Sequence, residues 1–164
     1  MATRLEGQTH VAGALTAESI TLPAGTVTNA GVAAAAGISA SKLEHQHQIT
    51  LAQDNGSAAT AQTRVVHVVY GATGTLQSIQ AGCETACIGD STIDVDVHVN
   101  GSSVLTATIE LSSSESAYEL VAGTFSDDDL TADDVIEIVI TVTAGTGTLG
   151  EGVFANLVLT EDAA

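Results

Sequence analysis

The chain has very few aromatic and very few basic residues. Only 2% of its 164 residues are aromatic, Trp is absent, and 3 Lys plus Arg face 20 Asp plus Glu, a formal net charge of −17. Three cations cannot neutralise a row of phosphates, so we expect no nucleic-acid partner. The same imbalance disfavours anionic membrane surfaces. Because the sequence also has no long apolar run and no signal-peptide layout at its start, we expect no membrane association.

The residues that are present divide the chain into two unlike parts. Residues 1–60 carry four acids and two bases and have no aromatic side chain, whereas residues 61–164 carry 16 acids, one base and all four aromatics. Small uncharged side chains bury too little area to offset chain entropy. Residues 1–60 are therefore either a disordered leader or an arm that orders on a partner. We favour an arm and linker used for attachment and subunit contacts. Residues 61–164 are predicted to be a folded domain.

The second part is a succession of predicted strands. Thr92–Val99 and Val135–Thr143 alternate apolar and polar residues, the pattern of half-buried antiparallel strands. Asn100-Gly101 follows the first of them and is a strong hairpin signal. Further strands are predicted at Val65–Tyr70, Leu76–Gln80, Val104–Leu111, Tyr118–Ala122 and Gly152–Thr160.

This spacing predicts an all-β fold, a jelly-roll-like antiparallel β-sandwich preceded by an extended, mostly irregular N-terminal arm. An immunoglobulin-type sandwich is less favoured, because its Cys…Trp…Cys core signature is absent. The predicted core face consists of Ile93, Val95, Val97, Val99, Leu105, Ala107, Ile109, Leu111, Ile136, Ile138, Ile140, Val142, Val153, Ala155, Leu157 and Leu159.

The arm has weak apolar patterning. Apolar residues alternate with Thr around a Pro23-Ala24-Gly25 turn, and a faint helical stripe predicts at most a short helix around residues 39–45. The small polar tract Gln53–Gln62 is predicted to be a linker. The candidate contacts with a partner or a neighbouring subunit are Ile20, Leu22, Val27, Val32, Ile38, Leu43, His45 and His47.

The histidines of the arm allow a second interpretation. His45 and His47 are two residues apart, so in a strand both rings lie on one face and could meet one metal ion or each other. In a symmetric trimer such rings could line the axis. A hydrogen-bonding role at a surface or interface is the simpler hypothesis, and His67 and His98 are expected to be structural.

The two cysteines do not form a metal motif. Cys83 and Cys87 are separated by three residues, whereas zinc ribbons and redox motifs use a two-residue gap. Free thiols are favoured, and a local disulfide remains the alternative.

Acidic residues cluster near residue 130. Asp127, Asp128, Asp129, Asp133 and Asp134 offer oxygen ligands of the kind that Ca²⁺ prefers. The spacing is not that of an EF-hand, so a solvated acidic loop is the simpler interpretation and calcium the alternative.

Catalytic motifs are missing from the sequence. It contains no Gly-x-Ser-x-Gly elbow, phosphate-binding loop, dinucleotide fingerprint or His-Glu-x-x-His zinc motif. We therefore do not expect an enzyme, and no cofactor is predicted.

The N-terminal pattern resembles that of a known class of proteins. Leu22-Pro23-Ala24-Gly25-Thr26-Val27-Thr28-Asn29-Ala30-Gly31-Val32, continued by Gly37-Ile38-Ser39-Ala40-Ser41-Lys42-Leu43-Glu44-His45-Gln46-His47, is similar to the arm of tailed-phage head decoration and head-fibre proteins. The resemblance covers roughly residues 15–50. The stretch from Asp129 to Leu159 is similar in style to the β-sandwich domains of these proteins.

The resemblance implies a virion protein made in the host bacterial cytoplasm. It implies a homotrimer on the outer capsid surface, with each arm on the major capsid protein or a neighbouring subunit. The leading functional hypothesis is therefore a capsid decoration or cement protein. The alternative is a phage fibre or spike module that binds a host-surface glycan, for which only Tyr70 and Tyr118 could stack on sugar rings.

Overall fold

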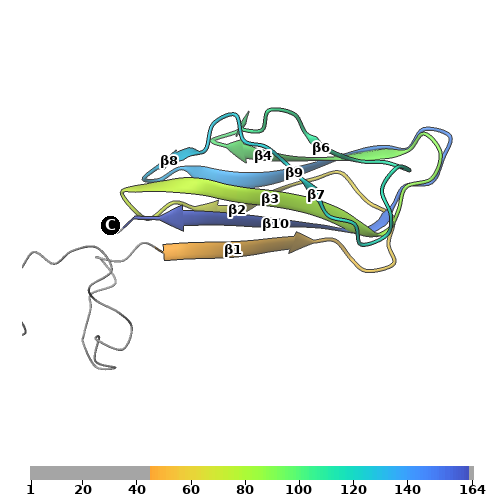
Figure 1. Ribbon diagram of the computed structural model, residues 1–164, viewed down its shortest axis with the longest axis horizontal. Helices are drawn as coiled ribbons and strands as arrows, with labels where there is room; N and C mark the ends of the chain where they lie inside the picture. Colours follow the sequence, from red (N-terminus) through yellow and green to blue (C-terminus); the bar gives the residue numbers. More distant parts are fainter. Residues whose placement is uncertain (1–44, 163–164) are drawn as a thin grey trace, which may run out of the picture. The chain divides into compact units, whose positions relative to one another are not determined.

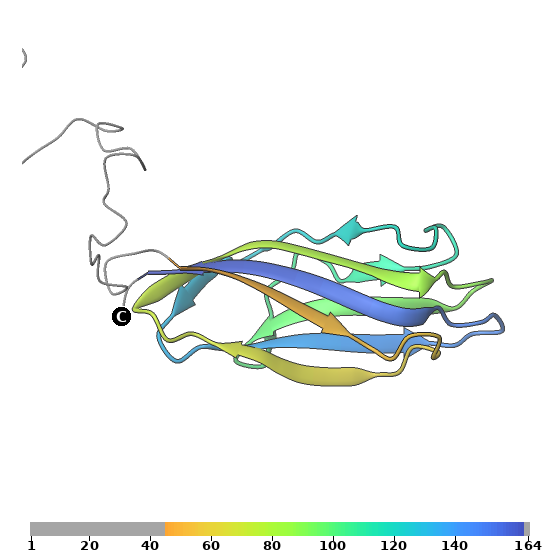
Figure 2. The same cartoon turned by 90° about the horizontal axis from the view of Figure 1, so that it is seen from below.

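In a computed structural model that describes residues 45–162, the chain forms two packed antiparallel β-sheets (Figures 1 and 2). This part of the chain contains no helix, and so none that could cross a membrane. The strands are β1 (His45–Ala52), β2 (Gln62–Val68), β3 (Thr73–Thr85), β4 (Thr92–Val99), β5 (Ser102–Ser103), β6 (Ile109–Leu111), β7 (Val121–Ala122), β8 (Asp129–Thr131), β9 (Val135–Thr143) and β10 (Glu151–Glu161).

The strands pair in a nested order. β1 pairs with β10 and β2 with β9, while β3 pairs with β7 and β8, and β4 with β5 and β6. This is the order of a long hairpin whose tip is the turn after β4. Rolling the hairpin up brings β10 beside β3 and β9 beside β4, which makes the two sheets of a jelly roll. The predicted all-β antiparallel sandwich is confirmed, and the predicted N-terminal arm before residue 45 lies outside the described residues.

The hairpin tip follows from two residues. Asn100 and Gly101 have φ angles of 52° and 80°, the left-handed pair that a tight primed turn needs. Val99 pairs with Ser102 directly across this turn. The predicted Asn-Gly hairpin is therefore confirmed.

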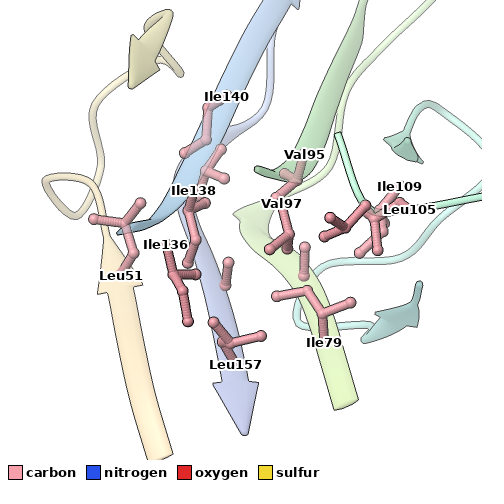
Figure 3. Packing of buried hydrophobic residues seen from close by; sticks show 14 of the residues in the cluster. Leu51, Ile79, Val95, Val97, Leu105, Ile109, Ile136, Ile138, Ile140 and Leu157 are labelled. Carbon is pink, nitrogen blue, oxygen red and sulfur yellow. The ribbon is translucent and has the colours of Figure 1, made fainter. Parts of the chain in front are cut away.

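The core lies between the sheets and is almost entirely aliphatic (Figure 3). β4 and β9 have the predicted bounds, and their inward residues are fully buried. Other predicted core positions are also buried, on β6 and β10. The buried residues of these four strands are Ile93, Val95, Val97, Ile109, Leu111, Ile136, Ile138, Ile140, Val153, Ala155, Leu157 and Leu159.

The predicted strand Val104–Leu111 is interrupted. Val104 and Leu105 are neighbours and both are buried, which a regular strand with a period of two does not allow. The chain turns there, and Leu105 forms an isolated bridge with Phe125. The predicted inward position of Ala107 is wrong, because the side chain is exposed.

The sandwich begins earlier than residue 61. All eight residues of β1 pair with β10, and His47, Ile49 and Leu51 face inward. The tract after β1 is a packed loop, in which Gln53 hydrogen-bonds the backbone of Thr60. Residues 45–60 thus belong to the sandwich, although the sequence analysis assigned them to the arm and linker. The inward series of β1 was missed because it contains histidine as well as aliphatic residues.

Two of the eight candidate contact residues, His45 and His47, lie in β1. The other six lie outside the described residues, as does the predicted helix except for its last residue.

Candidate metal centre

One end of the sandwich gathers two histidines and a glutamate from three strands. His47 comes from β1, His67 from β2 and Glu161 from β10, so both sheets contribute. Their ligand atoms all lie within 4.8 Å of one another. This is the one group of three or more potential metal-ligating side chains found among residues 45–162. The nested topology explains it, because the first and last strands are neighbours and β2 lies in the facing sheet.

Glu161 is held in place by more contacts than the two histidines of this group. Its side chain is 6% exposed, and Oε1 contacts Nε2 of His67. Oε2 accepts hydrogen bonds from the backbone N–H groups of Gly71 (3.1 Å) and Tyr70 (3.3 Å). Burial alone would raise the pKa of the Glu161 carboxyl, but the His67 ring and these N–H groups outweigh it and hold the pKa below its ordinary value. Glu161 is therefore a carboxylate at neutral pH.

Glycine is required where the backbone wraps around this carboxylate. A Cβ on Gly71 would lie 2.3 Å from the carbonyl oxygen of Asp162 and 3.2 Å from Cβ of Glu161. Any larger residue would push the Gly71 N–H away from Oε2.

The two histidine rings are in contact with each other. The centroids of His47 and His67 are 4.9 Å apart, with the ring planes inclined at 41°. Both side chains are half-buried at the mouth between the sheets. His45 shares the strand face of His47 and stands opposite Glu161 in the register, but it is exposed. The structure thus brings His47 to partners within its own chain.

The sequence pattern does not predict this cluster. Its spacing pairs His47 with His45, it leaves His67 with a structural role, and nothing in it distinguishes Glu161. The signal that could have found the cluster is the nested strand order, which places the first strand next to the last one.

His98, a described histidine outside this cluster, has a local partner. His98 on β4 contacts Asp96 at 3.0 Å, on the outer face of the other sheet.

The aspartates near residue 130 are used as turn acceptors. Asp134 accepts hydrogen bonds from the N–H and hydroxyl groups of Thr131 and from the side-chain amide of Asn100. Asp127 accepts the N–H of Asp129 at 3.3 Å. Asp134 therefore ties the loop before β9 to the hairpin tip, and calcium binding by the five aspartates remains only a sequence-based alternative.

Cys83 and Cys87 are both buried and both carry free thiols. The favoured interpretation is confirmed. Burial, followed by the nearby Cys87 and Glu115, raises the pKa of the Cys83 thiol. The N–H of Gly150 donates to the sulfur of Cys87 at 3.2 Å. These groups act as core residues rather than as nucleophiles.

The two exposed tyrosines lie at opposite ends of the sandwich. Tyr70 adjoins Glu161, which pairs with Gly74 near the start of β3, whereas the N–H of Tyr118 bonds the carbonyl of Cys83 near its end. The nine residue steps from Gly74 to Cys83 span about 30 Å of strand. Tyr70 and Tyr118 therefore do not form one aromatic platform.

No protein-family model matches the chain, and no curated protein matches its sequence.

Acid should destabilise the sandwich by protonating carboxylates that accept hydrogen bonds within turns. The backbone N–H of Ser112 lowers the pKa of Glu115, and that of Thr131 lowers the pKa of Asp134. A carboxyl whose pKa is lowered in the folded state stabilises that state above its unfolded pKa, about 4. The contribution is lost as pH falls through the folded pKa. We therefore expect the free energy of unfolding, measured by urea titration in 0.5 M NaCl, to decrease once the pH is lowered below about 4.

The variant Asp134→Asn should lose less stability on acidification than the wild type. Asp128→Asn removes an exposed charge from the neighbouring loop and is the control. Equal acid dependence in Asp134→Asn and wild type would contradict the assigned role of Asp134.

Proposed function

We propose that the chain is a structural protein of a bacteriophage head, a decoration or cement protein bound to the major capsid protein on the outer surface as a homotrimer. The observation that carries this proposal is the division of charge at His45, where the sandwich begins. Residues 1–44 hold three acids and two bases, whereas 17 acids and one base, Arg64, follow. The resemblance of residues 15–50 to the arms of phage decoration proteins supports the same division.

An acidic sandwich is suited to the outside of a particle but not to attachment by itself. Like-charged domains crowded on a shell repel one another, so the favourable contacts must come from another segment. Residues 1–44 supply apolar side chains and little charge. Apolar contact contributes about 25 cal/mol per Å² buried, and ordering a free segment offsets much of that gain. Presenting three segments in a trimer raises their effective concentration and makes attachment cooperative.

One surface groove in the described part of the chain offers little chemistry that would favour an enzyme. It has a volume of about 360 Å³ and is lined by residues 106–110 and 121–124, and Glu110 is the only ionisable side chain in that lining. The alternative, a fibre or spike module for a host glycan, is weaker, because Tyr70 and Tyr118 lie at opposite ends of the sandwich.

The test is co-sedimentation with undecorated heads of the phage that encodes the chain. The full chain should pellet with the heads, and the binding should persist in 0.5 M NaCl, because salt screens charges but not apolar contacts. A chain that begins at Ser41 keeps β1 intact and should remain in the supernatant. A full-length variant with Ile20, Leu22 and Val27 replaced by Ser is the matched control for chain length.

Two results would count against the proposal. If the chain beginning at Ser41 bound as tightly as the full chain, the sandwich would hold the capsid-binding surface. If the full chain failed to bind, the decoration hypothesis would be wrong. If it had a monomeric mass by light scattering at micromolar concentration, the trimeric form of the hypothesis would be wrong.

A further inference from the structure

We propose that His47, His67 and Glu161 bind one divalent transition-metal ion of the zinc class. The ion would join β1 to β10 of its own sheet and to β2 of the facing sheet. The inference stands on the geometry of the cluster and does not depend on the proposed function.

The spacing of the three ligand atoms is close to that of a metal centre. With metal–ligand bonds of about 2.0–2.1 Å, ligand atoms around a tetrahedral ion lie roughly 3.4 Å apart. The three ligand atoms lie within 4.8 Å of one another, and an ion would bind between them once the direct contact of His67 Nε2 with Glu161 Oε1 opens by side-chain rotation. The rings of His47 and His67 are half-buried and already lie with their centroids 4.9 Å apart.

The carboxylate is held as a metal ligand should be. Two backbone N–H groups fix Oε2 of Glu161, while Oε1 is directed toward the histidines. Partners that orient a ligand in this way are a regular part of metal sites. A Cβ at Gly71 would clash with the carbonyl oxygen of Asp162, so the backbone that donates to Oε2 packs closely against the end of β10.

A purely structural role explains only part of the cluster. A His67–Glu161 pair alone would satisfy the buried carboxylate. It gives no reason for a second imidazole, from a different strand, to face the first. A cation shared by two neutral imidazoles and one carboxylate accounts for all three side chains, and the strongly acidic sandwich attracts cations.

The ligand types select the ion. Two imidazole nitrogens and one carboxylate oxygen suit Zn²⁺, Co²⁺, Ni²⁺ or Cu²⁺, whereas Ca²⁺ and Mg²⁺ prefer sets made of oxygen alone. Three protein ligands leave a fourth position for water or for His45, which stands opposite Glu161 in the register. An ion bound here would link β1, β10 and β2. Its ligand on β1, His47, lies three residues after the end of residues 1–44, the segment proposed to bind the capsid.

The experiment is titration of the metal-stripped full chain with ZnCl₂ by isothermal calorimetry, with CoCl₂ absorption as a second readout. We expect one ion per chain, a higher melting temperature with Zn²⁺ than with EDTA, and no comparable shift with CaCl₂. His47→Ala should weaken this binding at least tenfold. His98→Ala removes a histidine of β4, outside the cluster, and should bind as the wild type does. Circular dichroism checks that both variants retain the β-fold.

The outcomes separate the proposal from weak binding to surface acids. Equal Zn²⁺ affinity and stoichiometry in wild type and His47→Ala would overturn the proposal, as would the absence of binding at 100 µM ZnCl₂. Should His47→Ala fail to fold, His47→Gln, which keeps a polar side chain of similar length, serves in its place. Loss of the Co²⁺ spectrum in that variant alone would support the site.

Discussion

A chain that begins at Gln62 is expected to lose the cooperative unfolding transition that a chain beginning at Ser41 retains. The deletion removes β1, whose eight residues all pair with β10, and with it the buried side chain of Leu51. It also removes Ala59, which is buried in the loop to β2. Loss of a buried Leu alone costs about 2–5 kcal/mol. Together with the lost pairing, this approaches the whole stability of a domain, about 5–15 kcal/mol.

The deletion also changes the edge of the sheet. β10 is flanked by β1 and β3, so removing β1 leaves eight of its eleven residues, 154–161, with one side unpaired. Long unpaired apolar edges promote association between chains. Urea unfolding followed by circular dichroism, with light scattering of the same samples, measures both effects. Equal urea midpoints for the two chains, without aggregation, would show that residues 62–164 fold independently, as the sequence analysis expected.

The alternation of small β-branched residues was enough to predict the central strands. Ile93 and Ile136 begin regular series in which every second residue is buried, and the Asn100-Gly101 turn is encoded by two adjacent residues. Such signals are local, so a single sequence reveals them. The interruption at Val104 and Leu105 was missed because it depends on a bridge to Phe125, twenty residues farther along the chain.

The candidate metal centre could not be predicted in the same way. His47 and Glu161 are separated by most of the chain, and His67 lies on a third strand in the facing sheet. No spacing in the sequence joins them. Only the nested pairing of first with last strand does so, and recognising it requires that His45–Ala52 be identified as a strand. Every second residue of this segment faces inward, but the first inward residue is a histidine, so the series did not have the aliphatic pattern of a buried strand face.

Replacement of Ile138 by Ala should give the largest effect of any single truncation in the core. Ile138 lies on β9 at the centre of its sheet, paired with Arg64 on β2 and with Val97 on β4, and its side chain is 0% exposed. Figure 3 shows it between the sheets, among residues of β9, β4 and β10. Removing three methyl or methylene groups there leaves a cavity that a close-packed aliphatic core cannot fill. We expect a loss of roughly 2–5 kcal/mol in the free energy of unfolding.

Val139→Ala is the matched control, because Val139 is the next residue of the same strand and points to the opposite face, where it is half-buried. Its cost should stay below about 1 kcal/mol, the range of strand propensity and partial burial. Both values come from urea titrations of the full chain. A one-residue slip in the register of β9 would exchange the two faces and hence the two costs. A larger loss for Val139→Ala than for Ile138→Ala would therefore refute the pairing of β9 with β2 and β4 described above.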